Sequence, residues 1–141
     1  MISPYEKLSI LLVDDEQFIR ELVARLLREM GVKTVIMAGD GDVAIKKLSA
    51  AGGRIDLMIL DLEMPKMNGF QVVQKVRQGD NDLKKDMPII ILTGHGQEDA
   101  VKKAVNLGVH GFMVKPMSRD VLEKRITQAM SSGPINPKIL E

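Results

Sequence analysis

The chain has 141 residues, 45% of them apolar and 28% charged, which is the usual balance of a single globular domain. It contains no cysteine, so disulfide scaffolds, thiolate metal sites and cysteine nucleophiles are excluded. The 20 basic and 19 acidic residues leave a net charge of +1, which gives no general attraction to nucleic acid or to an anionic membrane. Its apolar runs are far shorter than a membrane span or a signal sequence, so we expect a cytoplasmic protein.

Short apolar runs alternate with segments of helical periodicity along the whole chain. The first run ends in Asp14-Asp15, and apolar residues then recur at helical spacing from Phe18 to Met30. Ser118 is placed to cap the last helix. The predicted strands are 10–13, 34–37, 57–60, 88–92 and 111–114, and the helical segments that follow them are 18–30, 40–52, 70–76, 101–107 and 118–129.

This alternation predicts an α/β fold, a doubly wound parallel sheet with helices on both faces. Strands that are apolar throughout are typical of a sheet covered on both sides, and right-handed crossovers then place each helix. Five units are too few for an eight-fold barrel. We expect one domain from residue 7 to 131 and, where the chain becomes rich in Ser, Gly and Pro, a flexible tail or truncated linker from 132 to 141.

Polar side chains follow four of the five predicted strands. Asp14 and Asp15 end the first strand and Asp61 the third, while Thr93 and Lys115 follow the fourth and the fifth. An aspartate in such a place is often only a helix cap, and a lone threonine or lysine is often an ordinary turn residue. However, sites of open α/β sheets form outside the carboxyl ends of the strands, so these side chains should converge at one edge.

The converging residue types favour phosphoryl-transfer chemistry. Three carboxylates at one edge repel one another, which raises their pKa values or recruits a cation. Because the ligands are hard oxygens, that cation is best explained as Mg²⁺. Lys115 offers a point charge for a phosphoryl oxygen, Thr93 a hydroxyl donor, and Asp61 a candidate nucleophile.

Four short motifs together resemble the receiver domains of two-component response regulators, and most closely the stand-alone chemotaxis type. Each motif is weak alone, but the ordered set is specific and covers residues 7 to 130. The motifs are Leu11-Leu12-Val13-Asp14-Asp15, Leu60-Asp61-Leu62-Glu63-Met64-Pro65 with Asn68-Gly69, Leu92-Thr93-Gly94, and Val114-Lys115-Pro116. The resemblance implies the flavodoxin-like strand order 2-1-3-4-5.

The resemblance also implies a role for each matching residue. Asp61 is the phosphoacceptor, and it receives the phosphoryl group from a phosphohistidine of a histidine kinase or a histidine phosphotransfer protein. Asp15, Asp61 and the backbone carbonyl of Glu63 bind Mg²⁺, and Asp14 assists through water. Lys115 pairs with Asp61 at rest and with the phosphoryl group afterwards, and the Lys115-Pro116 bond is expected to be cis.

A switch and two lifetime-tuning positions complete the implied site. Thr93 hydrogen-bonds the phosphoryl group, and Phe112 turns inward to change the face of the last two helices and the fifth strand, which a downstream protein reads. Phe112 is equally explained by core packing. Glu63 and His95 lie at the mouth of the site and set how long the phosphoryl group survives, although His95 is also explained as an exposed loop residue.

Two other functions stay open at this point. A phosphatase of the haloacid dehalogenase type also uses a strand-end aspartate and Mg²⁺, but it needs a second aspartate where Glu63 stands. A receiver-like interaction module that works without phosphorylation usually lacks one of the acids, the threonine or the lysine, and all are present here.

The chain is expected not to be an enzyme and not to bind nucleic acid or membrane directly. Its kinase, its output partner, a dimer that depends on phosphorylation, and whether it is a fragment of a longer regulator stay open.

Overall fold

The computed structural model describes residues 3–94 and 98–140. Its strands are all parallel and form one five-stranded sheet in the order β2-β1-β3-β4-β5, which confirms the predicted doubly wound α/β fold. The strands are β1 Ser9–Val13, β2 Thr34–Ala38, β3 Leu57–Asp61, β4 Ile89–Thr93 and β5 Gly111–Val114. The helices are α1 Gln17–Glu29, α2 Gly41–Ala51, α3 Gly69–Gln78, α4 Glu98–Asn106 and α5 Arg119–Ser131, with short 3₁₀ turns η1 Asp80–Asp82 and η2 Pro137–Leu140.

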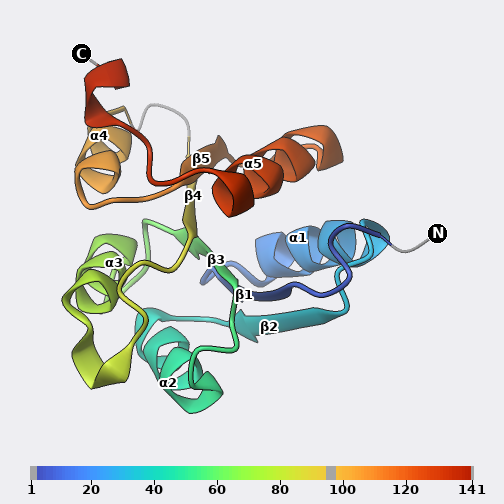
Figure 1. Cartoon of the computed structure of the whole chain (residues 1–141), viewed down its shortest axis with the longest axis horizontal. Helices are drawn as coiled ribbons and strands as arrows, with labels where there is room; N and C mark the ends of the chain where they lie inside the picture. The colour runs from blue at the N-terminus through green and yellow to red at the C-terminus, as the bar shows by residue number, and fades with distance from the viewer. Residues whose placement is uncertain (1–2, 95–97, 141) are drawn as a thin grey trace.

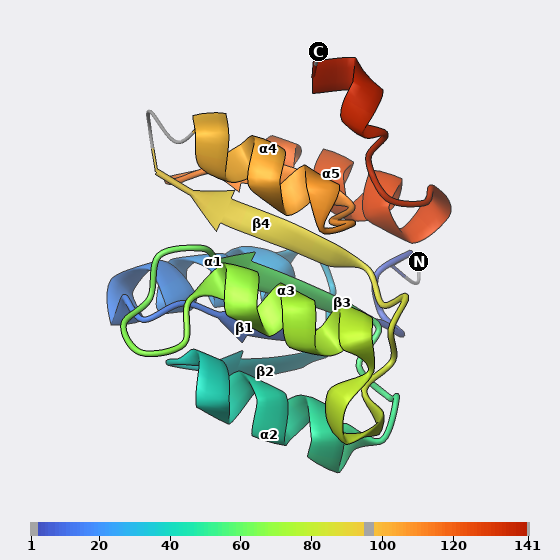
Figure 2. The same cartoon turned by 90° about the vertical axis from the view of Figure 1, so that its left-hand side faces the viewer.

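Helices cover both faces of the sheet and divide the core into two layers. Helices α1 and α5 lie on one face, and α2, α3 and α4 lie on the other (Figures 1 and 2). Alternate residues of each strand therefore enter different layers: Leu60 and Ile91 pack with α2, α3 and α4, while Ile59 and Leu92 pack with α1 and α5. Strands β3 and β4 are buried along their whole length because neither is at an edge of the sheet.

Phe18, the first apolar residue of the first helical pattern, lies outside the core. The buried stripe of α1 consists of Ile19, Val23 and Leu27 with Ala24, whereas Phe18 is 75% exposed. Residues 18 and 19 differ by about 100° around the helix axis, so both cannot face the sheet equally. Phe18 is therefore part of the apolar pattern of the sequence but not of the face that packs on the sheet.

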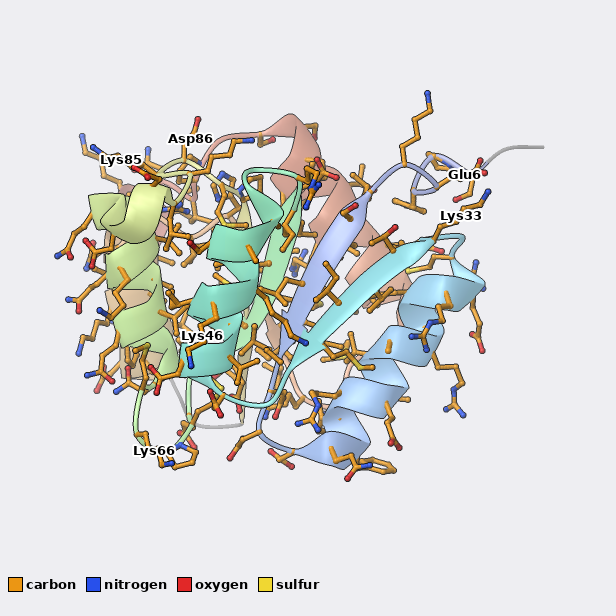
Figure 3. The ribbon with its side chains drawn as sticks, turned by 90° about the horizontal axis from the view of Figure 1, so that it is seen from below. Glu6, Lys33, Lys46, Lys66, Lys85 and Asp86 are labelled. Carbon is orange, nitrogen blue, oxygen red and sulfur yellow. The ribbon has the colours of Figure 1, made fainter. Side chains whose placement is uncertain are left out.

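Different residues lie at the amino ends and at the carboxyl ends of the parallel strands. The amino ends of the strands hold the ion pair between Glu6 and Lys33 and, farther along, Lys85 and Asp86 (Figure 3). The carboxyl ends lie at the opposite edge, where Figure 3 shows Lys66 in the loop between β3 and α3. Lys66 has a φ of 66°, in the left-handed region, so this loop turns sharply before α3 begins.

The chain after α5 crosses to the other layer of the core. The amide of Ile135 donates to the carbonyl of Val109 at 3.0 Å, and the half-buried Ile135 side chain packs with the layer under α2, α3 and α4. The short turn η2 then lies against α4. The flexibility expected of residues 132–141 stays a prediction.

None of the helices formed by residues 3–94 and 98–140 has both the length and the apolar character that crossing a membrane requires.

Gly69 begins α3 where no side chain fits, so we expect Gly69→Ala to destabilise the fold. A Cβ there would lie 2.5 Å from the carbonyl oxygen of Asp61 and 2.7 Å from the Cα of Leu62. Alanine is otherwise favoured in a helix, so a loss of about 1–3 kcal/mol in urea unfolding would report this backbone clash. In Gly133→Ala the new Cβ would meet nothing within 4 Å, and that variant should keep wild-type stability. Equal stability of the two variants would contradict the prediction.

Candidate functional site

Four strand ends bring their polar residues to one place at the carboxyl edge. Asp61 is the last residue of β3 and Thr93 the last of β4, while Asp14 and Lys115 come directly after β1 and β5. The Nζ atom of Lys115 lies 3.2 Å from Asp14 Oδ2 and 3.3 Å from Asp61 Oδ2. The convergence that the strand pattern predicts is therefore present.

Asp14 is held at the end of β1 by four contacts. Its amide donates to the carbonyl of Ala38, and its own carbonyl accepts from Arg20 at 2.6 Å. Its carboxylate accepts from the Glu16 amide through Oδ1 and from Lys115 through Oδ2. The N-cap residue of α1 is Glu16. Asp14 and Asp15 are therefore not the cap of this helix, which was the alternative explanation for the two aspartates.

One carboxylate oxygen of Asp61 has no hydrogen-bond partner within the part of the chain that the structure describes. Its Oδ1 atom accepts from the Glu63 amide at 3.2 Å. Its Oδ2 atom is fully buried and, among the described residues, has no hydrogen-bond partner, although Lys115 lies within ion-pair distance. A buried carboxylate oxygen without a donor is unfavourable, so this atom is available for a metal ion or for a reacting group.

Burial and neighbouring charge together shift the acid–base behaviour of the site. Burial is the largest cause that raises the pKa of Asp61, to about 7; the charge of Asp14 adds to it, and Lys115 and the Glu63 amide partly oppose it. Burial also raises the pKa of Asp14, against the Glu16 amide and Lys115. Burial by itself lowers the pKa of Lys115, but the hydrogen bond to Glu16 and the charges of Asp61 and Asp14 outweigh it and raise that pKa. Lys115 therefore stays charged while Asp61 is easily protonated in the absence of a cation.

Thr93 and Phe112 lie on neighbouring strands and face the same layer of the core. Phe112 is opposite Ile91 in the pairing of β4 with β5, and Thr93 is opposite Val114. Phe112 is half-buried and packs with the layer that also holds Ile91, and alternation along β4 places Thr93 on that face. Thr93 is 4% exposed, and its hydroxyl donates to the carbonyl of Gly94 at 3.3 Å.

Two further predicted residues, Asp15 and Glu63, lie beside this centre. Asp15 and Glu63 are exposed, and Glu63 adjoins Asp61 through its amide. His95 lies outside the residues that the structure describes. The Lys115–Pro116 bond is cis, as expected.

Two contacts of the site were not predicted from the sequence. Glu16 lies 3.1 Å from the ammonium of Lys115, and Arg20 holds the Asp14 carbonyl. A signal for Glu16 was present, because Asp14, Asp15 and Glu16 form an uninterrupted acidic run in which only the first two residues received a role. Arg20 gave no comparable signal, since an arginine in the first turn of a helix is commonly a solvated residue.

The acidic residues fit a divalent cation. Asp14, Asp15, Glu16 and Asp61 each place a carboxylate oxygen within 4.8 Å of the others. Asp61, whose Oδ2 atom lacks a hydrogen-bond partner among the described residues, is one of these four. Oxygen ligands of this kind match Mg²⁺.

Comparison with known proteins agrees with this arrangement. The family model of the response regulator receiver domain matches residues 10–127. The chain belongs to this family. It is similar to the chemotaxis protein CheY of Treponema pallidum, with 31% identity over 91% of this chain and 84% of that protein, and to CheY1 of Helicobacter pylori, with 35% identity over 89% and 99%. A solved receiver domain protein from Clostridium thermocellum superposes with a TM-score of 0.79 at 28% identity, over 87% of this chain and 94% of that one.

Membership of this family confirms the resemblance that was drawn from the motifs, and the match to a solved receiver domain confirms the flavodoxin-like fold. The chain is a receiver domain of two-component signal transduction, and its CheY relatives match a receiver of the stand-alone chemotaxis type. Aspartate phosphorylation and Mg²⁺ are features of this family.

The raised pKa of Asp61 predicts how stability depends on pH without metal. The folded state keeps the proton up to about pH 7, whereas an unfolded aspartate loses it near 3.8, so the free energy of unfolding falls as pH rises between these values. Asp61→Asn removes this decrease in the free energy of unfolding, because an amide side chain does not titrate. In EDTA, we expect Asp61→Asn to be more stable than wild type by about 1–3 kcal/mol at pH 8, with the difference shrinking toward pH 5. A difference independent of pH in urea unfolding would contradict this prediction.

Proposed function

We propose that this receiver domain accepts a phosphoryl group on Asp61 from a phosphohistidine, in a step that depends on Mg²⁺, and that it then changes its α4–β5–α5 face for a partner protein. One observation carries the proposal: the buried Oδ2 atom of Asp61 has no hydrogen-bond partner among the described residues, yet it lies 3.3 Å from the ammonium of Lys115 and within an acidic cluster. A carboxylate oxygen left free at such a point is placed to act as a nucleophile.

In the proposed step, Asp61 Oδ2 forms a bond to phosphorus while the bond between phosphorus and the imidazole nitrogen of the donor breaks. The imidazole keeps the electron pair of that bond and takes up a proton. Lys115 remains protonated throughout and balances charge on the transferred oxygens, because its carboxylate neighbours raise its pKa. The Glu63 amide donates to Asp61 Oδ1 and so leaves Oδ2 directed at the incoming group.

The metal ligands that we propose are the carboxylates of Asp15 and Asp61 and the backbone carbonyl of Glu63, with Asp14 assisting. The burial of Asp14 and Asp61 and their proximity to one another support this choice. When bound, Mg²⁺ neutralises the repulsion between the carboxylates and the phosphoryl oxygens.

The proposed switch uses Thr93 and Phe112. The Thr93 hydroxyl donates only to the carbonyl of its neighbour Gly94, a long contact of 3.3 Å, so a phosphoryl oxygen is a stronger acceptor for it. Because Phe112 lies on the adjacent strand and on the same face of the sheet, a shift of Thr93 is transmitted to the layer in which Phe112 packs. Glu63 and His95 are proposed to set the lifetime of the phosphoryl group.

The proposed partners follow from this chemistry. The donor is a histidine kinase or a histidine phosphotransfer protein, and the output is a protein bound at the α4–β5–α5 face. The domain is proposed to act in the cytoplasm as a phosphoacceptor that at most removes its own phosphoryl group slowly, and not as an enzyme acting on other substrates.

Intact-mass measurement after incubation with acetyl phosphate tests the phosphoacceptor role. We expect a single phosphoryl adduct in the presence of Mg²⁺, and none with EDTA or in Asp61→Asn, because the step requires both the cation and the free carboxylate oxygen.

The matched control is Asp56→Asn, which alters an aspartate before β3 whose carboxylate accepts from the amide of Ser9, away from the site. This variant should form the adduct as wild type does. Failure of wild type to bind beryllofluoride with Mg²⁺ as well as to form the adduct would contradict the proposal and favour a module that works without phosphorylation.

Thr93→Val tests the switch, because it removes the hydroxyl and keeps the branched shape. We expect the adduct on Asp61 to form, while the changes in amide NMR shifts of β5 and α4 on beryllofluoride binding fall to about half of wild type or less. Thr127→Val, which removes a hydroxyl on α5 that contacts Tyr5, serves as the control. Undiminished shift changes in Thr93→Val would rule out this residue as the link.

A further inference from the structure

The Lys115 ammonium lies within ion-pair distance of three carboxylates, those of Asp14, Glu16 and Asp61. Its ammonium donates to Asp14 Oδ2 at 3.2 Å and to Glu16 Oε1 at 3.1 Å. The contact with Asp61 Oδ2 is an ion pair of 3.3 Å, and that oxygen accepts no hydrogen bond from residues 3–94 and 98–140. At rest, therefore, Glu16 holds a donor of Lys115 that a phosphoryl group on Asp61 would need.

Glu16 is built into the entrance of the site. It occupies the N-cap position of α1, yet its side chain makes no capping hydrogen bond and turns to Lys115. Its amide donates to Asp14 Oδ1, which fixes its backbone beside the buried carboxylates. The position of Glu16 is thus set by the same aspartate that shares Lys115 with it.

The two partners of Lys115 differ in how easily they can release it. The Asp14 side chain is fully buried, so it has no water to replace the ammonium. The Glu16 side chain is 60% exposed and can be solvated as soon as the contact breaks. Movement of the ammonium toward a phosphoryl oxygen should therefore break the contact with Glu16 first.

The charge of Glu16 acts on a cation and on a phosphoryl group with opposite signs. Its carboxylate oxygen is part of the acidic cluster, within 4.8 Å of oxygens from Asp14, Asp15 and Asp61. At such distances a negative charge attracts Mg²⁺ and repels the oxygens of a phosphoryl group. It also competes with those oxygens for Lys115.

We propose that Glu16 is a positioning residue that occupies a hydrogen-bond donor of Lys115 in the resting site, so that it favours the metal-bound state and opposes the phosphorylated one. This inference rests on the proposed function and adds a residue that acts through Lys115. Glu16 thereby sets the balance between the empty and the phosphorylated receiver without touching the reacting atoms itself.

The test compares Glu16→Gln with wild type in two binding measurements that involve no turnover. Calorimetry gives the affinity for Mg²⁺ alone, and an NMR titration at saturating Mg²⁺ gives the affinity for beryllofluoride, a phosphoryl mimic. We expect Glu16→Gln to bind Mg²⁺ about two- to fivefold more weakly and beryllofluoride about three- to tenfold more tightly.

Glu21→Gln is the matched control. Glu21 is exposed on the same helix and accepts a hydrogen bond from Gln17 instead of Lys115. Its loss of charge should change either affinity by less than about twofold.

Failure of the inference about Glu16 and failure of the proposed function give different results in these measurements. If Glu16→Gln binds beryllofluoride no more tightly than wild type, or if both affinities weaken together, Glu16 does not restrain Lys115 and the inference fails. If wild type itself binds no beryllofluoride, or binds it equally well as Asp61→Asn, the proposed function fails and the inference fails with it.

Discussion

The site depends on the attraction between one ammonium and the carboxylates that a parallel sheet brings to its carboxyl edge. Asp14 and Asp61 are buried at neighbouring strand ends, where two negative charges without compensation would be strongly unfavourable. Lys115 arrives from the edge strand, two strands from Asp61, and lies within 3.3 Å of both. The hydrophobic layers on both faces fix the strands, and the strands fix these charges.

Compensation in this site is incomplete, and that is the basis of its chemistry. The pKa of Asp61 is raised to about 7 even with Lys115 nearby, because burial and Asp14 outweigh the ammonium. A site with full compensation would have little affinity for a cation, and one with none would protonate its carboxylates instead of binding metal. The acidic excess at this edge therefore suits a receiver domain, because phosphorylation and Mg²⁺ are features of this family.

Most of the fold and of the site centre could be predicted from the sequence because both follow from local patterns. Apolar runs ending in polar residues located Asp61, Thr93 and Lys115, and the topology of a parallel sheet explains why these residues meet. Contacts made by helix residues were harder to predict. Phe18 fits a helical apolar pattern yet faces solvent, and Glu16 takes part in the site only because the start of α1 turns its side chain toward Lys115.

The crossing of the chain after α5 has a consequence for self-association. β5 is an edge strand, and such strands offer unpaired backbone groups to which another chain can add. The amide of His110 points to β4, so the carbonyl of Val109 in the same peptide unit points outward, and the amide of Ile135 occupies it. The chain thus caps the beginning of its own exposed edge, which disfavours aggregation through strand addition at that end.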